Sequence, residues 1–405
     1  MTRTVIAPGI ALNCVTTGQF KTNVLTLYFL RRLDAAEAAL NALLPSVMRR
    51  GNAKYPDLKA MSDALADLYG ASLIPSVVKR GELHCFGLAS TFISESLDGV
   101  AGLMLDTVFE PVLSHYTESE RGNLITRIRS AKNDKTSYAV QRLDALACEG
   151  TPYAVARLGG EESAAAITKP LLEQHYLEVL KTSRVEIFYC GTAEPERIKA
   201  ILLPRFEAAN RNYSDFPKCE NDILRNEPRY FTEHEDVEQA KLAIMWRGGE
   251  YENLRDFISA YTASVIYGGG AGKLFENVRE RLSLCYYANA QLDRYKSVIK
   301  ASSGVEAANI DRARDEMLAQ WNAVTAGDFS DDDIAHAKAS MLNAWLSAAD
   351  SPAGLETFWQ GQAASERAES LEDWSAELET VGKQDIVGAA SGFTLDAVYC
   401  MRAKE

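Results

Sequence analysis

The chain has 405 residues, with 43 lysines and arginines against 56 aspartates and glutamates, which gives 43 − 56 = −13 at pH 7. At about 150 residues per domain, this length predicts two domains with cores that need no disulfide or metal support. The acidic balance argues against nucleic acid or an anionic membrane as a partner, because both bind basic surfaces. No stretch reaches the roughly 20 apolar residues of a membrane span, and the N-terminus turns polar too early for a signal peptide. We therefore expect a cytoplasmic protein.

The cysteines and histidines form no recognisable metal or disulfide motif. The seven cysteines are scattered without a CxxC pair, and several lie in apolar runs, which is typical of reduced, buried thiols. No two of the five histidines lie within one helical turn, so the chain has no HxxxH or HxxEH pair. The phosphate-loop, nucleophile-elbow and dinucleotide-binding motifs are also absent from the sequence. A zinc site assembled from distant parts of the chain stays open as an alternative.

The first half of the chain predicts the mixed strands and helices of an α+β protein. Residues 23–30 are rich in β-branched and aromatic side chains, which is typical of a strand. The Ala- and Leu-rich residues 35–48 predict a helix that ends at the basic turn before Gly51. The other predicted elements are, in chain order, a helix over 58–69, strands over 72–78 and 83–88, helices over 96–109 and 117–132, a helix beginning near Lys169, a strand over 185–190 and a helix over 196–208.

The second half repeats this order after a polar stretch over residues 210–238, which we interpret as a linker. The glycines within residues 268–272 predict a helix end or a loop rather than a phosphate cradle, because no Lys-Ser or Lys-Thr follows them. The elements predicted after the linker are a strand over 240–246, helices over 255–266 and 274–281, strands over 284–292 and 298–305, and helices over 310–325 and 331–349.

Superposing Leu58 on Leu274, an offset of 274 − 58 = 216 residues, matches helix to helix and hairpin to hairpin. We therefore predict an α+β fold of two similar halves, each an antiparallel sheet flanked by helices. The predicted organisation is an N-terminal domain over residues 1–209, a linker over 210–238 and a C-terminal domain over 239–405. Two unrelated α+β domains are the alternative.

Five stretches carry a family resemblance that covers nearly the whole chain. They are Thr151-Pro-Tyr153 together with residues 160–168, residues 189–196, residues 237–242, residues 394–399 and, as the most specific, residues 274–286 with the sequence LFENVRERLSLCY. These stretches resemble the insulinase-type (M16) family of zinc metallopeptidases and its inactive homologues. The resemblance implies a LuxS/M16-like metallohydrolase fold in a clamshell arrangement. Residues 394–399 and 284–287 are similar to a bacterial subgroup associated with 5-aminopentanol modification of elongation factor P.

The chain departs from this family at the zinc site. Active members carry HxxEH on the helix before a basic-Gly turn, where two histidines bind zinc and the glutamate polarises the attacking water. Counting back from Gly51, the histidine positions fall on Ala42 and Ser46 and the glutamate position on Pro45. The family's third ligand, a glutamate, falls near Arg127. The resemblance therefore implies a degenerate zinc site, no metal in this chain, and no peptidase activity by the chain alone.

The second half retains a pair of residues that the family uses on its substrate. Family members bind the peptide backbone and stabilise the oxyanion with an Arg and a Tyr seven residues apart, and the matching positions here are Arg279 and Tyr286. A guanidinium is always charged and directs several donors at oxygen atoms, while a phenol donates one directional hydrogen bond. The alternative is structural, with Arg279 paired to Glu276 on a solvated helix and Tyr286 half-buried in a strand.

Three functions follow as hypotheses. The first is a non-catalytic subunit that pairs with a zinc-bearing M16 relative, or with itself in isolation, and contributes Arg279 and Tyr286 in trans to the hydrolysis of a peptide. The second is a binding or scaffold protein that supports elongation factor P modification. The third is an enzyme of different chemistry, for which the sequence offers no constellation. Zinc is expected only in a partner subunit.

Overall fold

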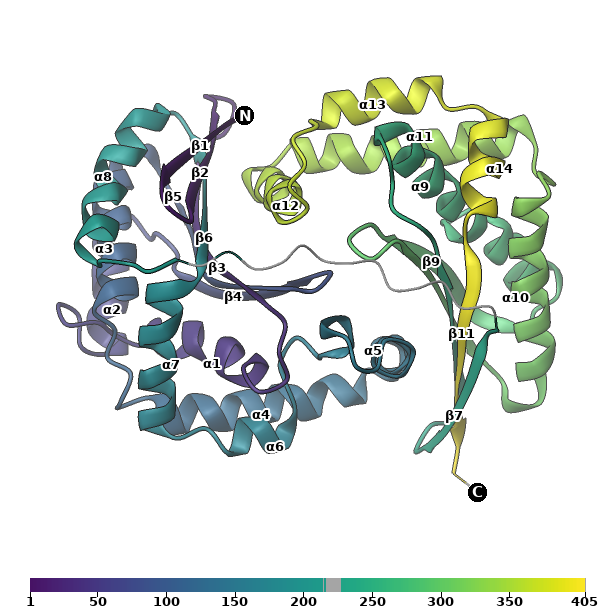
Figure 1. The fold of residues 1–405 in the computed structure, drawn as a ribbon, viewed down its shortest axis with the longest axis horizontal. Helices are drawn as coiled ribbons and strands as arrows, with labels where there is room; N and C mark the ends of the chain where they lie inside the picture. Colours follow the sequence, from purple (N-terminus) through teal and green to yellow (C-terminus); the bar gives the residue numbers. More distant parts are fainter. Residues whose placement is uncertain (214, 216–226, 405) are drawn as a thin grey trace. The chain divides into compact units, whose positions relative to one another are not determined.

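The computed structural model describes residues 1–213, 215 and 227–404, so residues 214 and 216–226 of the expected linker lie outside the described residues. The chain divides into two compact units, each an α+β assembly of one sheet and its helices (Figure 1). The described part of unit 1 lies within residues 1–130, 155–218 and 347–368. That of unit 2 lies within residues 131–154, 219–346 and 369–405.

Unit 1 contains a six-stranded sheet whose neighbouring strands are antiparallel except for one parallel pair, β2 and β6. The hairpin predicted around residues 79–82 is confirmed as β4 and β5, joined at Gly81, whose φ of 58° favours a residue without a Cβ. In spatial order the strands are β1 (Thr2–Ala7), β2 (Ile10–Thr16), β6 (Arg184–Gly191), β3 (Asn23–Arg32), β5 (Leu83–Phe92) and β4 (Ile74–Arg80).

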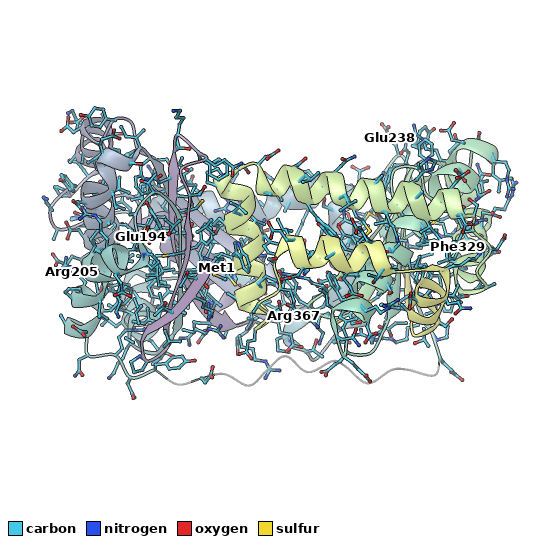
Figure 2. The ribbon with its side chains drawn as sticks, turned by 90° about the horizontal axis from the view of Figure 1, so that it is seen from above. Met1, Glu194, Arg205, Glu238, Phe329 and Arg367 are labelled. Carbon is cyan, nitrogen blue, oxygen red and sulfur yellow. The ribbon has the colours of Figure 1, made fainter. Side chains whose placement is uncertain are left out.

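A helical layer packs on one face of this sheet and closes the core of unit 1. Alternate strand residues such as Leu27, Phe29 and Ile187 point into that core, where they meet the apolar faces of the helices. Figure 2 shows Arg205 at the outside of this layer, where it binds Asp106 at 2.7 Å and so joins two helices. The helices of unit 1 are α1 (Ala38–Met48), α2 (Leu58–Asp67), α3 (Leu97–Phe109), α4 (Thr117–Asn133), α6 (Glu161–Ala165), α7 (Lys169–Thr182) and α8 (Pro195–Ala208), with the 3₁₀ turn η1 (Ser94–Ser96).

Unit 2 contains a five-stranded sheet with the same connectivity. In spatial order its strands are β7 (Arg229–Glu235), β11 (Thr394–Ala403), β8 (Ala240–Arg247), β10 (Val298–Val305) and β9 (Cys285–Asp293). This order corresponds to β2-β6-β3-β5-β4 of unit 1, and the pair β7 and β11 is again parallel. The prediction of two similar α+β halves is therefore confirmed. Strand β7 lies within the stretch interpreted as a linker. Its residues alternate in exposure, as is typical of a strand at the edge of a sheet.

The helices of unit 2 surround an aromatic core in which Trp246, Tyr267 and Trp321 pack edge to face or tilted at centroid distances of 5.2–5.4 Å. None of the helices in the part of the chain that the structure describes combines the length and apolarity needed to cross a lipid bilayer. The helices of this unit are α9 (Leu254–Gly268), the π-helix η3 (Leu274–Arg281), α10 (Ile310–Thr325), α11 (Asp331–Ala349), α13 (Leu371–Thr380) and α14 (Lys383–Ser391), with the 3₁₀ turns η2 (Pro152–Ala154) and η4 (Ala307–Asn309).

Each unit contains one helix contributed by the opposite half of the chain. Helix α5 (Lys135–Ala147) packs in unit 2 on β8, β10 and β11, while α12 (Pro352–Ala364) packs in unit 1 on β3 and β6. Both helices cover the sheet face that the helical layer leaves open, so the central strands of each sheet are buried on both faces. Each compact unit therefore contains one segment from the other half of the chain. The expected boundaries at 209 and 239 assign each of these segments to its own half instead.

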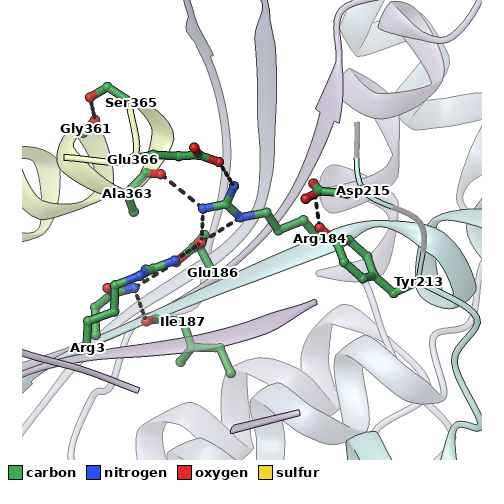
Figure 3. A network of polar contacts seen from close by, with 11 residues as sticks. Arg3, Arg184, Glu186, Ile187, Tyr213, Asp215, Gly361, Ala363, Ser365 and Glu366 are labelled. Atoms are coloured by element: carbon green, nitrogen blue, oxygen red, sulfur yellow. Dashed lines mark hydrogen bonds and ion pairs between the residues drawn. The ribbon is translucent and has the colours of Figure 1, made fainter. Parts of the chain in front are cut away.

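Helix α12 is joined to its sheet by a cluster around a buried carboxylate (Figure 3). We call Arg3, Asn13, Arg184 and Glu186 the Glu186 cluster. Glu186 on β6 accepts hydrogen bonds from Arg3 at 2.6 and 2.8 Å, Arg184 at 2.9 Å and Asn13 at 2.9 Å. Arg184 also donates to the carbonyl oxygen of Ala363 at 3.1 Å, beside the negative C-terminal end of α12.

The same arrangement recurs in unit 2 around Asp396 on β11. We call Arg229, Arg247 and Asp396 the Asp396 cluster. The two guanidiniums donate to the carboxylate at 2.8 and 2.7 Å, and Arg229 also donates to the carbonyl oxygen of Ala147 at 2.7 Å, at the end of α5. Ala147 and Ala363 are 363 − 147 = 216 residues apart, which is the offset predicted for the repeat. Both exchanged helices thus end on an arginine that a buried carboxylate orients.

Candidate functional site

Helix α1 holds the three positions at which the resemblance places the metal-binding motif. Its residues are almost all buried: Ala42 is fully buried, Pro45 is buried, and Ser46 is half-buried. None of the three carries the imidazole, thiolate or carboxylate that zinc takes as ligands in proteins. The helix is therefore an apolar packing element at the positions where the resemblance places the metal-binding motif.

Pro45 changes the helix as well as its chemistry. It lies inside α1, where the missing backbone N–H and the ring cost a helix the hydrogen bond to the carbonyl four residues earlier, that of Asn41. A proline at the position of the expected glutamate also removes the general base that would polarise water. The missing carboxylate therefore acts against metal-assisted hydrolysis at this helix.

A buried polar cluster lies beside these positions, and the sequence did not indicate it. Asn41 accepts a hydrogen bond from His175 Nε2 at 2.7 Å through its Oδ1 atom, and its Nδ2 atom donates to His84 Nδ1 at 3.3 Å. Burial lowers the pKa of His84 to about 4 and also lowers the pKa of His175. Both imidazoles are therefore neutral at pH 7 and hydrogen-bond to an amide. Among the described residues, no group of three histidine, cysteine or acidic side chains is arranged to hold a metal ion.

The expected third-ligand position lies on α4. Arg127 is exposed on this helix, whereas Glu120, one of the acidic residues near its start, is buried. The carboxylate of Glu120 accepts a hydrogen bond from Arg50 Nε at 2.6 Å, so it already has a cationic partner. Helix α4 thus exposes the cation Arg127 to solvent, while its buried carboxylate, Glu120, forms an ion pair with Arg50.

The expected substrate-binding pair, Arg279 and Tyr286, lies on the helix η3 and on the strand β9 that follows it. The predicted helix over residues 274–281 is present as a π-helix, whose wider turn is a frequent feature of functional sites. Arg279 on this helix is 45% exposed, and its guanidinium carbon lies 4.9 Å from the centroid of the Phe275 ring. Its carboxylate neighbour is Glu280, with Nε and Oε1 3.7 Å apart, rather than the Glu276 of the structural alternative.

Tyr286 lies on β9 and is 55% exposed. Its hydroxyl donates to Glu306 Oε1 at 3.2 Å, and this hydrogen bond raises the pKa of Tyr286, so the phenol keeps its proton. Burial raises the pKa of the adjacent Cys285 thiol, and the positive charge of Arg279 partly offsets this rise. Arg279 and Tyr286 are therefore both exposed near the start of β9, but only Arg279 presents donors to solvent, because the Tyr286 hydroxyl donates to Glu306.

The glycines that precede this π-helix have a packing role. Helix α9 ends at Gly268, as predicted, and the N–H of Gly269 donates to the carbonyl of Val265 at 2.8 Å. A Cβ on Gly268 would lie 2.3 Å from Ala290 on β9, so only glycine lets helix and strand approach this closely. Gly268 therefore lets the end of α9 pack closely on the middle of β9.

A hollow of about 370 Å³ in unit 1 is lined by charged residues. Its arginines at positions 3 and 184 already have acceptors within the protein. Arg3 and Arg184 direct their donors at Glu186 and at the end of α12. Tyr213, on the opposite wall, donates to Asp215 at 2.7 Å (Figure 3). The hollow therefore belongs to the attachment of α12 and offers no free cation from these two residues to an anion.

Comparison with known proteins places these features in a family context. Residues 166–341 match the family model described as the peptidase M16 inactive domain. A relative from Bacillus subtilis (strain 168) with the name "Probable inactive metalloprotease YmfF" is 29% identical over 412 residues, which cover 98% of this chain and 96% of the relative. This chain is therefore similar to M16 proteins, through a family model described as an inactive domain and a relative named as a probable inactive metalloprotease.

Solved structures share the fold over the full length. A conserved protein from Enterococcus faecalis V583 superposes with a TM-score of 0.90 at 23% identity, covering 100% of this chain and 98% of that one. A peptidase M16 inactive domain from Pseudomonas fluorescens superposes with a TM-score of 0.83 at 15% identity, with coverage of 100% and 98%. The predicted M16-type fold is confirmed, and the likeness to the elongation factor P subgroup stays a prediction.

Proposed function

We propose that this chain is a non-catalytic M16-like subunit that pairs with a zinc-bearing relative and contributes peptide-binding groups to it in trans. One combination of features carries the proposal. The expected zinc positions Ala42, Pro45 and Ser46 offer no ligand, while Arg279 and Tyr286 are both exposed near the start of β9. Such a chain has no means of activating water at α1, but it can bind a peptide carbonyl or an oxyanion that forms in its partner.

The proposed chemistry assigns separate tasks to the two side chains. The Arg279 guanidinium supplies a permanent charge with several N–H donors. The Tyr286 phenol, whose pKa is raised, would supply one hydrogen bond in exchange for the one that it donates to Glu306. Both side chains would act on the carbonyl oxygen of a peptide. A zinc ion in the partner would supply the activated water that cleaves this peptide. Zinc belongs to the partner in this proposal, and the peptide is the shared substrate.

The cytosol is the compartment in which we propose that this pair works. All the described cysteines are free thiols, most of them buried, which suits a reducing compartment. The net charge of −13 disfavours nucleic acid and anionic membranes as partners.

Affinity capture of the tagged chain at native abundance, followed by mass spectrometry and zinc analysis, tests the pairing. We expect a stoichiometric partner that carries HxxEH, with about one zinc per pair, because four protein and water ligands complete one such site. Recovery of the chain without any HxxEH protein and without zinc would contradict the pairing.

A scaffold that supports elongation factor P modification is the second candidate. The observation that favours it is that Arg279 and Tyr286 already have neighbours of their own, Phe275 with Glu280 and Glu306 respectively. In that case the capture recovers components of the modification machinery with no zinc. Substitution of Arg279 then leaves modification unchanged, whereas the heterodimer proposal requires an effect on peptide hydrolysis.

A further inference from the structure

We infer that Arg127 and Arg157 together form a binding site for a phosphoryl group on the surface of unit 1. Both residues belong to this unit, as do the residues of β4 and β5 around them. The inference goes beyond the proposed function, because it concerns another surface, another ligand and none of the residues that would act on a peptide.

The guanidinium of Arg157 is held by the protein on one side and open on the other. Its Nη1 atom donates to the carbonyl oxygen of Val77 on β4 at 2.9 Å. The residue is exposed, and its Nε and Nη2 atoms have no acceptor among the described residues. A guanidinium binds an oxyanion through two parallel N–H donors, and the Nε–Nη2 edge supplies such a pair. The hydrogen bond to Val77 therefore orients a donor pair that stays open to solvent.

The backbone on both sides of Arg157 is also held in place. Gly159 has a φ of 72°, and a Cβ on it would lie 2.7 Å from the backbone nitrogen of Ala39 at the start of α1. On the other side, Lys79 Nζ donates to the carbonyl oxygen of Val155 at 3.3 Å. The segment thus packs on α1 and is bound to β4, so the guanidinium needs little ordering when a ligand binds.

Arg127 supplies the second cation, and it differs from its neighbours on α4. Arg121 donates to the carbonyl oxygen of Ile167 at 2.7 Å, and Arg129 Nε donates to Glu161 at 2.8 Å. Arg127 lies between them in the sequence, is exposed, and has no acceptor in the part of the chain that the structure describes. Its donors are therefore available to a ligand.

The two guanidiniums lie close together without a counter-charge. Burial lowers the pKa of Arg157, and the charge of Arg127 lowers it further. A like charge has this effect when it lies within about 4–6 Å. No carboxylate among the described residues offsets the shift. The charges of Arg157 and Lys79 also add to the lowering of the His84 pKa that burial causes. This surface is therefore locally positive, although the whole chain has a net charge of −13.

The local charge indicates which anion fits. A carboxylate carries a single negative charge and is matched by one guanidinium. A phosphoryl group carries about −1.5 to −2 charges at pH 7 and has three acceptor oxygens, so it matches two arginines with Lys79 nearby. Its binding would also remove the repulsion between the two guanidiniums. Free inorganic phosphate and a phosphorylated side chain both offer this group.

Isothermal titration calorimetry of the full chain at constant ionic strength tests the site. The probes are inorganic phosphate, a short peptide with a single phosphoserine, and the same peptide with glutamate in its place. We expect saturable binding with a Kd of about 1 mM or lower. Tighter binding of the phosphopeptide than of phosphate identifies a phosphorylated protein as the source, and weaker or equal binding identifies the free ion. No saturable binding of either phosphate probe, or equal affinity for the glutamate peptide and the phosphopeptide, would overturn the inference.

Arg127→Ala separates this site from a general effect of surface charge. The variant should bind phosphate at least about tenfold more weakly, because it loses a charge-assisted contact. Lys132→Ala is the matched control, since Lys132 is an exposed cation on the same helix and its loss changes the net charge equally. The control should bind phosphate like the wild type. Equal losses in the two variants would contradict a site at Arg127.

Arg127→Glu gives a second readout that an arginine with a purely structural role would not produce. It places a carboxylate beside Arg157, where the structure otherwise has two like charges. In phosphate-free buffer this variant should melt about 1–3 °C above the wild type. Added phosphate should raise the Tm of the wild type more than that of the variant. A lower Tm of the variant without phosphate, or equal responses to phosphate, would overturn the inference. None of these results bears on the pairing with a zinc-bearing relative, which the capture experiment tests separately.

Discussion

The carboxylate of Glu186 is fully buried, yet it accepts hydrogen bonds from two arginines and an asparagine. Burial alone would raise the pKa of Glu186, but the hydrogen bonds and charges of Arg3, together with Arg184 and Asn13, outweigh burial and hold it below the ordinary value. The charge is therefore present in the folded protein at neutral pH, and the stability of unit 1 depends on it.

Glu186→Gln should destabilise unit 1 by about 3–5 kcal/mol, because it leaves two guanidiniums without their counter-charge. Glu366→Gln is the matched control: Glu366 is 45% exposed and lies 3.4 Å from Arg184, so its loss should cost less than about 1 kcal/mol. Urea unfolding of both variants measures the difference. In the wild type the contribution of Glu186 is present above its unfolded pKa, about 4.3, and is lost as the pH falls through the lower folded value. Similar losses for the two variants would contradict this account.

His84 predicts a second, separate dependence on pH. Burial lowers its pKa to about 4. A backbone hydrogen bond with Arg157 opposes this shift, while the charges of Arg157 and Lys79 add to it. Between the ordinary histidine pKa of about 6.5 and this value, the unfolded chain binds a proton that the folded chain does not. The free energy of unfolding should therefore fall with decreasing pH, by up to about 1.4 kcal/mol per unit from this group.

His84→Gln removes this titration while it retains an acceptor for Asn41. Its free energy of unfolding should vary less steeply between pH 6.5 and 4 than that of the wild type, with His175 still contributing in the same direction. Urea unfolding at a series of pH values measures both slopes. Parallel slopes for variant and wild type would show that His84 does not titrate in this range.

At the residue scale, the sequence indicated Arg279 and Tyr286 through their spacing of seven residues on a family motif. It did not indicate the cluster of Asn41, His84 and His175, whose members lie 43 and 134 residues apart. Such side chains meet only because α1, β5 and α7 pack together. No local periodicity records that meeting, and an alanine-rich helix gave no reason to single out one asparagine.

The exchanged helices show the corresponding limit at the scale of elements. The pattern predicted β3, α1 and the β4–β5 hairpin, because alternation and helical spacing are local properties. It also predicted the repeat offset, since both halves place similar elements in the same order. The exchange of α5 and α12 was not predictable in this way. The pattern of an amphipathic helix shows which face is buried but not which sheet it packs against.

The two arginines that bind the ends of these helices predict local effects. Arg184→Met removes the donor to Ala363, and Arg229→Met removes the donor to Ala147. Each loss also leaves a buried carboxylate with one cation fewer, so we expect a cost of about 1–3 kcal/mol. Hydrogen exchange with mass spectrometry should show lower protection in α12 for the first variant and in α5 for the second. Loss of protection in both helices for either variant would mean that the two attachments do not act independently.

At the scale of the whole molecule, the chain combines an M16-type fold with a helix α1 whose residues Ala42, Pro45 and Ser46 offer no zinc ligand. Ala42 and Pro45 lie in a packed core, so a zinc site there would need several simultaneous substitutions. In the proposed function, the exposed Arg279 needs no such change to act on a peptide. A partner that supplies the metal would therefore complete a function of which this chain holds one part.

Arg279→Ala tests that division in the captured pair. If the guanidinium stabilises a developing oxyanion, its removal should lower kcat by about 100- to 1,000-fold, and Arg279→Lys should recover part of the loss through charge alone. Assembly should not change, because Arg279 is a half-exposed side chain that packs on Phe275. Arg281→Ala is the matched control on the same π-helix: that side chain is 63% exposed and lies 3.6 Å from Glu316. Steady-state hydrolysis of a peptide, measured beside the mass of the complex, separates a catalytic loss from an assembly defect. Equal activity of the Arg279 and Arg281 variants would exclude a role in hydrolysis and favour the scaffold.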